Sequence, residues 1–398
     1  MEKRLGFLDG LKVAAMLLVF NIHFFNAYYC GVYTLDPASF HTRHGVEWWI
    51  GATPLNIIYA GKVGARLFLT VSAFLLVWGY LQKGNPGKLL LTPVTKYLRL
   101  VGPIVVVNLL ICFLMSAGAY RNLQAAELAG SYETFGVYNQ FEPEVFQAFQ
   151  EGAWGCFWFG ENRYNGPLWF IQYEFLGCIL LAALLYVTGR WKTIYRLAVY
   201  LMLALLLIRT DYLCMVLGGL VAEIYAGESK NREKGTGQRS CVERLWAWCG
   251  KLFGCAPAMW ILFLCCLFLM TYPSLGKTEG TIYAWLPPKV LFYYNIALPG
   301  FLLAILYLRP VQKLLDKRIF RWFHGISYCF YLVHFPMLCT VSAAFFVSMY
   351  GKLSYHVLAV FTYLLTFLAS GFLAWGLQKC VDGPMQRLVR RLTKRFVY

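Results

Sequence analysis

Charged residues are scarce in this chain of 398 residues. They make up 14% of it, whereas hydrophobic residues make up 59% and the mean hydropathy is +0.55. A soluble domain carries about 25% charged residues, because its surface must face water. The shortage of charge therefore excludes an ordinary soluble domain and predicts a polytopic integral membrane protein of the all-α class.

Two chemical signatures are also missing. The 13 cysteines form no CxxC pair and no Cys/His pattern with metal-ligand spacing, so we expect no bound metal. There is no glycine-rich loop of the kind that cradles nucleotide phosphates. Most cysteines are expected to pack as small hydrophobic residues. Cys30 and Cys156 both fall on the predicted outer side and are candidates for a disulfide, but two separate thiols are the favoured interpretation.

Long apolar runs, by contrast, are abundant. A hydrocarbon core of about 30 Å needs about 20 apolar residues in one helix. Ten runs approach that length, and the fifth to seventh are the shortest, so the fifth and sixth are also compatible with one bent or re-entrant unit. The runs are 11–29, 63–82, 100–119, 168–188, 194–208, 211–226, 258–272, 290–308, 326–349 and 355–378.

Acidic residues are outnumbered by basic ones, and the net charge is +17. With ten spans, the two termini, the even-numbered connections and the span ends that adjoin them hold 27 of the 36 Lys and Arg residues. Because cytoplasmic loops collect Lys and Arg, both termini are predicted to be cytoplasmic, in a plasma or inner membrane. The basic residues are dispersed over short loops, so anionic lipid head groups account for them and a nucleic-acid partner is not expected.

Two predicted outer connections are unusually long. Residues 30–62 contain "HTRHGVEWW", and residues 120–167 contain six glutamates against two arginines. A structureless loop longer than about 15 residues is uncommon and usually has a function or folds by itself. These connections are therefore candidates to cap a cavity from outside. The alternative is that they are solvent-exposed loops around the helix ends, without a function of their own.

The first apolar run carries two ionisable residues, Lys12 and His23. Eleven residues separate them, which places both on one helix face with about 16 Å of rise between them. Ionisable groups at membrane depth usually face a cavity or the interior of the bundle. Lys96 and Arg99 lie one turn apart at the start of the third run, where they could hold a phosphate-bearing ligand. The structural alternatives are a snorkelling Lys12, a hydrogen-bonded His23 and ordinary basic anchoring by Lys96 and Arg99.

Several motifs occur in the order typical of the membrane-bound acyltransferase-3 family, which this chain resembles along almost its whole length. The first is a basic residue, ten intervening positions and a histidine. Two departures are Ala73 where the family usually has glycine, and Asp382-Gly383-Pro384 where it usually has E-x-P. The matching stretches are "LDGLKVAAMLLVFNIHF", "RLFLTVSAFLL", "KYLRLVGP", "GPLWFIQYEF", "ISYCFYLVHFPML" and "VDGPMQRL".

The resemblance implies transfer of an acyl group, most often acetyl, from cytoplasmic acyl-CoA to a hydroxyl of a carbohydrate acceptor. A hydroxyl that attacks a thioester needs a base, and His23 is the expected one. Lys12, Lys96 and Arg99 are expected to offset the CoA phosphates. We expect residues 1–385 to form the transmembrane acyltransferase domain and 386–398 a basic cytoplasmic tail, in a stand-alone form without an appended domain.

Other polar and aromatic residues in the apolar runs are secondary candidates. Glu174 is a candidate catalytic carboxylate or the partner of a cation in an internal ion pair. Tyr331 and His334 continue a polar stripe that begins at Ser327, and they are candidate substrate-binding residues, with hydrogen bonding between helices as the alternative. Trp169 is a candidate to stack on a sugar, with interfacial anchoring as the alternative.

Two other classes of function remain open from the residues alone. A transporter or flippase for a glycan or small solute is compatible with ten spans and buried ionisable residues, although no internal repeat or pair of broken helices is evident. A catalytically silent membrane partner protein is the third class. The oligomeric state, the acyl chain and the acceptor are left open.

Overall fold

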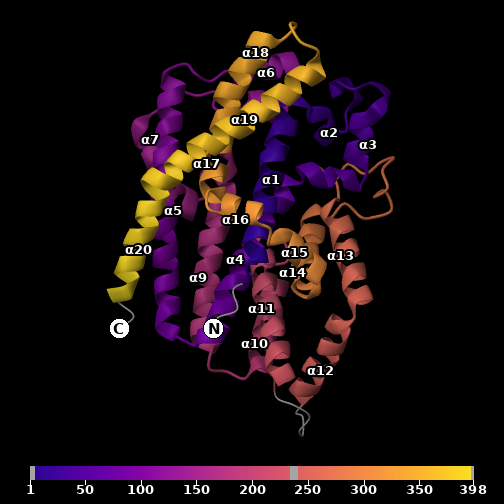
Figure 1. Cartoon of the computed structure of the whole chain (residues 1–398), viewed down its shortest axis with the longest axis vertical. Coiled ribbons are helices and arrows are strands. Elements are labelled where there is room, and N and C mark those ends of the chain that lie inside the picture. The colour runs from indigo at the N-terminus through magenta and orange to yellow at the C-terminus, as the bar shows by residue number, and fades with distance from the viewer. Residues whose placement is uncertain (1–4, 234–240, 396–398) are drawn as a thin grey trace.

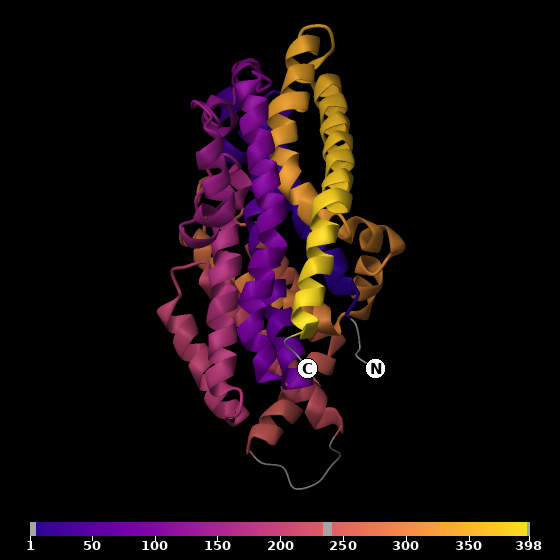
Figure 2. The same ribbon diagram turned by 90° about the vertical axis from the view of Figure 1, so that its left-hand side faces the viewer.

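The computed structural model describes residues 5–233 and 241–395. Over these residues the secondary structure is helical, without strands. Successive long helices run in alternating directions, so the beginning and the end of the described chain lie at the same end of an elongated bundle (Figure 1, Figure 2). The predicted all-α class is confirmed.

Seven helical segments of the described chain are long and apolar enough to cross a membrane. They become eight if α12 (Cys241–Gly254) and α13 (Ala256–Met270), which are bent by 79°, count as one broken span. The seven are α1 (Phe7–Tyr28), α4 (Gly61–Lys83), α5 (Pro86–Ser116), η6–α9 (Gly166–Thr188), α14 (Val290–Tyr307), α17–α18 (Ser327–Met349) and α19 through α20 (Tyr355–Thr393).

All ten predicted runs lie on helices, but the fifth to seventh fall on the less apolar or shorter ones. The fifth is α10 (Thr193–Leu206), which has 14 residues, and the sixth is the first part of α11 (Tyr212–Glu233), which ends in a polar stretch. The fifth and sixth runs are two separate helices that pack on each other. The seventh is α13, on one side of the 79° bend.

Both long connections fold into short helices. Residues 30–62 form α2 (Cys30–Thr34), η1 (Pro37–Ser39), η2 (Arg43–Gly45), α3 (Val46–Ala52) and η3 (Pro54–Tyr59). Residues 120–167 form α6 (Asn122–Ala129), η4 (Tyr132–Gly136), α7 (Val145–Gln150), η5 (Glu151–Gly155) and α8 (Cys156–Trp158). The segments α7 and η5 pack along α5 and not out in solvent (Figure 1).

The cysteines make no disulfide among the described residues. The Cys30 thiol donates to the Gly130 carbonyl at 3.2 Å, and the Cys156 thiol donates to the Gly152 carbonyl at 3.8 Å. Cys30 and Cys156 are therefore two separate thiols.

Small residues let the central helices approach closely. A Cβ atom added to Gly64 on α4 would lie 2.5 Å from the Ala15 carbonyl oxygen on α1, and one added to Gly218 on α11 would lie 2.5 Å from the Thr70 carbonyl oxygen on α4. Small residues at helix contacts are the usual means of close packing in membranes, where lipid removes the hydrophobic drive between helices. The contacts hold α4 between α1 and α11 at the centre of the bundle.

The last helical segment continues α19 (Tyr355–Leu377) through a π-helical turn, η8 (Gln378–Asp382), into α20 (Gly383–Arg395). This helix packs on α5 beside Gly102 (Figure 2). The predicted basic tail begins inside α20, and its described part, up to residue 395, is helical. It forms one wall of the cavity described next.

Candidate active site

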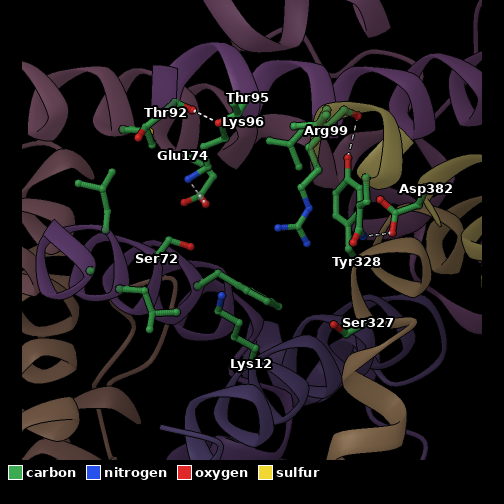
Figure 3. A pocket seen from close by; sticks show the side chains of 18 of the residues that line it. Lys12, Ser72, Thr92, Thr95, Lys96, Arg99, Glu174, Ser327, Tyr328 and Asp382 are labelled. Atoms are coloured by element: carbon green, nitrogen blue, oxygen red, sulfur yellow. Dashed lines mark hydrogen bonds and ion pairs between the residues drawn. The ribbon is translucent and has the colours of Figure 1, made fainter. Parts of the chain in front are cut away.

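A cavity of about 800 Å³ lies among α1, α4, α5, α9 (Trp169–Thr188), α17 (Ser327–Met337) and the η8–α20 segment (Figure 3). At the end of the bundle that holds both termini, it is lined by Lys83, Asn85 and Lys88 from the turn between α4 and α5. From there it runs inward to Phe170 and Tyr331. Because it extends from the turn between α4 and α5 to Tyr331 on α17, the cavity suits an elongated ligand that enters beside that turn.

Three of the cations that line the cavity, Lys12, Lys96 and Arg99, lie in one cluster, and of these three Lys96 is the one with an ion-pair partner in the described chain. The Lys96 ammonium lies 2.6 Å from Oε1 of Glu174, while Oε2 of Glu174 has no hydrogen-bond partner. Lys12 and Arg99 make no hydrogen bond or ion pair with a described residue. Lys12 on α1 and Arg99 on α5 approach the same space from opposite sides (Figure 3).

The charges of this cluster favour an anionic ligand. Lys12 is half-buried and Arg99 is accessible from the cavity, so both are available to a bound group. A cation held in a partly dehydrated site gains most from a charge-assisted hydrogen bond to phosphate or carboxylate. The Lys96–Glu174 pair adds no net charge, so Lys12 and Arg99 carry the attraction.

The wall opposite α4 contains a buried carboxylate that the sequence analysis did not assign to the site. Asp382 is 2% exposed; its Oδ2 accepts a hydrogen bond from Gln386 at 2.7 Å, and its Oδ1 has no partner. The neighbouring Tyr328 hydroxyl donates to the Leu100 carbonyl at 2.9 Å. Asp382, Gln386 and Arg390 all line the cavity, at the spacing of one helix face. That spacing, combined with the terminal Asp-Gly-Pro element, is the sequence signal that could have placed Asp382 in the site.

The inner end of the cavity is aromatic. The Tyr331 ring lies 4.9 Å from Phe170 and 6.3 Å from Phe68, measured between ring centroids. The Tyr331 hydroxyl donates a hydrogen bond to the Pro167 carbonyl just before α9. On its other side, the Tyr331 ring is 5.8 Å from the ring of His334. Tyr331 is therefore the boundary between the charged cavity and a histidine pair.

The histidine pair is formed by His23 on α1 and His334 on α17. Their ring centroids are 5.2 Å apart, with a tilt of 42°. His334 is 1% exposed and His23 is half-buried. Nδ1 of His334 lies 2.7 Å from the Tyr331 carbonyl oxygen, while its Nε2 is buried without a hydrogen-bond partner. His23 is thus the accessible member of the pair and His334 the enclosed one.

A buried carboxylate, that of Glu151, holds the segment before α9 in place by hydrogen bonds. Glu151, 3% exposed, accepts hydrogen bonds from the Asn108 amide at 3.0 Å and from the backbone N–H groups of Arg163 and Tyr164 at 2.8 and 3.1 Å. Burial raises the pKa of the Glu151 carboxyl, and these N–H donors oppose the rise. The next residue, Asn165, donates to the Leu332 carbonyl on α17 at 3.0 Å. The network therefore anchors the turn of α17 that precedes His334.

The predicted site residues divide into three places. Trp169 does not line the cavity; its ring lies 5.5 Å from the Arg66 guanidinium. His23 and His334 face each other beyond the inner end. The residues brought together around the cavity are Lys12, Lys96, Arg99, Glu174 and Tyr331.

Among the described residues, no three His, Cys, Asp or Glu side chains come together as ligands of a metal ion would. Comparison with curated proteins and with solved structures returns no match. A comparison with protein-family models matches the acyltransferase domain of the acyltransferase-3 family over residues 5–375. This match covers nearly the whole chain, including the histidine pair and the cavity walls formed by α1, α4, α5, α9 and α17, and the protein therefore belongs to the acyltransferase-3 family.

Proposed function

We propose that the protein transfers an acyl group, with acetyl the expected one, from cytoplasmic acyl-CoA to a hydroxyl of a cell-surface or membrane-linked carbohydrate. The observation that carries this proposal is the arrangement of one charged cavity and one histidine pair on either side of Tyr331. An anionic donor and a proton acceptor are the two things that acyl transfer from a CoA thioester needs.

The cavity supports the choice of acyl-CoA as donor. Its volume of about 800 Å³ falls within the range of cofactor-sized pockets, about 300–1,000 Å³. Lys12 and Arg99 offer charge-assisted hydrogen bonds to phosphate, and Lys88 and Arg390 add positive charge nearer the termini. In the proposed pose the phosphates lie among these cations, and the acyl end points toward Tyr331 and the histidines.

The proposed reaction needs one base. A lone pair of the acceptor hydroxyl oxygen attacks the thioester carbonyl carbon as His23 takes the hydroxyl proton. The new C–O ester bond forms, the C–S bond breaks, and the CoA thiolate takes up the proton that His23 releases. Exchange of a thioester for an ester is not uphill, so the proposed step needs no nucleotide hydrolysis.

The topology that this function requires places the cavity mouth in the cytoplasm, where acyl-CoA is found. The two ends of the described chain lie at the mouth end (Figure 1), and most Lys and Arg residues fall in the corresponding connections. A reporter fused after Tyr398 should report cytoplasm, and one inserted near Glu142 should report the outer face. The reverse result at both positions would contradict the proposed direction of transfer.

Radiolabelled acetyl-CoA supplied to membranes that contain the protein tests the activity. We expect covalent label in the glycan fraction and release of free CoA, neither of which appears with membranes that lack the protein. Transport of an unmodified solute without label transfer would support a transporter instead.

His23→Gln tests the assignment of the base. General-base contributions are typically about 10²- to 10⁴-fold, or roughly 3 to 5 kcal/mol of barrier, so kcat per folded molecule should fall by that factor. The matched control is His44→Asn, which removes an exposed histidine of the outer connection. Both variants are compared after normalisation to monodisperse detergent-solubilised protein. Turnover of His23→Gln within a factor of about three of wild type would exclude His23 as the base.

A further inference from the structure

We propose that His334 is a second proton-transfer residue, which accepts a hydrogen bond from His23 through its Nε2 and completes a relay of two imidazoles. The inference rests on the proposed acyl transfer. It assigns His334 a role in the reaction itself, in place of the substrate contact or helix-to-helix hydrogen bond that its position in the sequence suggests.

The hydrogen bond at Nδ1 decides which nitrogen of His334 carries the proton. A backbone carbonyl only accepts, so Nδ1, 2.7 Å from the Tyr331 carbonyl oxygen, must be the N–H donor. In the neutral ring the proton on Nδ1 leaves Nε2 as a bare lone pair. That lone pair is buried and has no partner among the described residues, a state that costs free energy unless something donates to it.

His23 is the donor that the geometry offers. The two ring centroids are 5.2 Å apart, and no hydrogen bond joins the rings in this arrangement. Hydrogen bonds between catalytic groups are often long before substrate binds and tighten in the productive complex. The ring of His23 is also held 5.0 Å from Phe335, on the same helix as His334. A small rotation of His23 would therefore bring one of its N–H groups to Nε2 of His334.

The difference in exposure sets the order of the relay. His23 is half-buried and can be reached by an acceptor, whereas His334 is 1% exposed and lies behind it, against Phe20 and Phe330. This is the arrangement in which one group touches the substrate and a second, enclosed group orients it. With Nε2 of His334 accepting from one nitrogen of His23, the other nitrogen of His23 is left bare for the acceptor hydroxyl.

The backbone around His334 is fixed strongly enough to hold this tautomer. The Tyr331 hydroxyl donates a hydrogen bond to the Pro167 carbonyl, and the Asn165 amide donates one to the Leu332 carbonyl. Tyr331 and Leu332 are therefore both hydrogen-bonded to the segment before α9. The Tyr331 carbonyl therefore cannot turn away from Nδ1 without breaking other bonds.

The relay consists of two proton transfers, and both are reversed after the ester bond forms. The acceptor hydroxyl proton moves to the bare nitrogen of His23, and the proton on the opposite nitrogen of His23 moves to Nε2 of His334. The hydroxyl oxygen forms the ester bond, the C–S bond breaks, and the thiolate leaves. The protons then return in the reverse direction, His23 protonates the thiolate, and the two rings regain their starting tautomers.

His334→Asn separates this role from a structural one. The amide N–H₂ of asparagine can still donate to the Tyr331 carbonyl, but the variant has no group at the position of Nε2. We expect kcat to fall by about 10- to 1,000-fold, with the KM values of both substrates within about twofold and thermal stability retained. His334→Leu, which loses both functions, should lose kcat to a similar extent and stability in addition.

A structural role predicts a different pattern. His334→Asn would then keep near-normal kcat, and only His334→Leu would be impaired. If His334→Asn does not yield monodisperse protein, His334→Gln replaces it: its amide oxygen can accept a hydrogen bond from His23 at the position of Nε2 but cannot take up a proton, so the relay again predicts a loss of kcat. Turnover within about threefold of wild type in either folded variant overturns the relay.

A double variant gives a second, independent reading. In a relay, the effects of His23 and His334 are not additive, because His334 acts only through His23. The double variant His23→Gln/His334→Asn should therefore turn over as fast as His23→Gln, whereas a further drop of about tenfold or more would show that His334 acts separately.

The pH profile of kcat provides another test. In His334→Asn the profile should change in shape as well as in height. If wild-type protein shows no acyl transfer, the proposed function fails; if it does and His334→Asn is normal, only the relay fails.

Discussion

Charged side chains gather in two regions of this bundle, and the regions differ in whether those charges have partners. On the side of α10 and α11, Arg196 makes two hydrogen bonds to Glu223, at 2.8 and 2.9 Å, and two further bonds to backbone carbonyls. A second ion pair joins α4 to the start of α11, where Arg66 pairs with Asp211 at 2.6 Å. Every one of these charges is paired inside the described chain.

In the cavity region, the balance is incomplete. Lys96 is neutralised by Glu174, but Lys12 and Arg99 have no partner in the described chain, and one oxygen of Asp382 is also unpartnered. A buried pair needs its partner because the cost of dehydrating a lone charge is several kcal/mol. The Arg196–Glu223 and Arg66–Asp211 ion pairs therefore hold helices together, whereas Lys12 and Arg99 in the cavity are available to a ligand.

Breaking the Arg196–Glu223 pair should have the largest effect on stability. Arg196→Met leaves Glu223, which is 1% exposed, without its partner, and we expect a loss of about 3–5 kcal/mol of unfolding free energy. Thermal unfolding of the detergent-solubilised protein measures this loss. Arg196→Met/Glu223→Leu should recover most of it, because no charge is then left buried. A single variant as stable as wild type would contradict the structural role of the pair.

Lys12→Met tests the opposite expectation. Because Lys12 has no partner to leave uncompensated, stability should change by less than about 1 kcal/mol. A lost hydrogen bond to a charged group costs about 1.5–3 kcal/mol, so the KM for acyl-CoA should rise about 10- to 100-fold. Lys12→Arg, which keeps the charge, should be mild. Loss of stability with an unchanged KM would make Lys12 a structural residue like Arg196.

Glu174→Gln tests the role of the ion pair between Lys96 and Glu174. If the carboxylate serves to neutralise Lys96, the variant makes Lys96 available beside Lys12 and Arg99, and the KM for acyl-CoA should stay equal or fall by a few fold. Turnover should remain within about threefold of wild type, measured by release of free CoA. A drop in turnover by about two orders of magnitude or more would instead place Glu174 among the catalytic residues, as its position in the sequence allowed.

The smallest effect is expected at the mouth. Lys88 is exposed, and exposed charges are screened by salt over a Debye length of about 10 Å at 0.1 M. Lys88→Gln should therefore raise the KM for acyl-CoA by about threefold or less at low salt, and the difference from wild type should vanish in about 0.5 M NaCl. A salt-independent effect would mean a direct contact with the donor.

Much of the fold could be predicted, because a membrane span is a local property of about 20 residues. The seven segments that are long and apolar enough to cross a membrane match seven of the predicted runs. The weaker runs were harder to judge, since α10 is short and α13 is bent against α12. The helices of residues 120–167 were not predicted, because their stability comes from packing on other helices, α7 and η5 on α5 and α6 on α18, and from the buried hydrogen bonds of Glu151, not from a continuous apolar pattern.

The candidate site was predicted in its parts but not in its arrangement. Lys12, Lys96, Arg99 and Glu174 stand out in the sequence because ionisable residues are rare in apolar runs. The ion pair that removes Lys96 from the available cations joins α5 to α9, and no periodicity within one helix can reveal it. Asp382 has a sequence signal, the Asp-Gly-Pro element with the spacing of one helix face, but its place in the cavity wall depends on packing between helices that lie far apart in the chain.

The sequence alone established that the protein is an all-helical membrane protein, and its ordered motifs indicated the acyltransferase family. Both are properties of composition and local order, which need no knowledge of neighbours. Helix packing decided which charges are paired, that Tyr331 separates the charged cavity from the histidines, and that His334, whose Nε2 is buried without a hydrogen-bond partner, lies with its ring 5.2 Å from the ring of His23. Most of these features depend on distances of a few ångströms between side chains of different helices, as far apart in the chain as His23 and His334, and such distances are set by the tertiary structure and not by the order of residues along one helix.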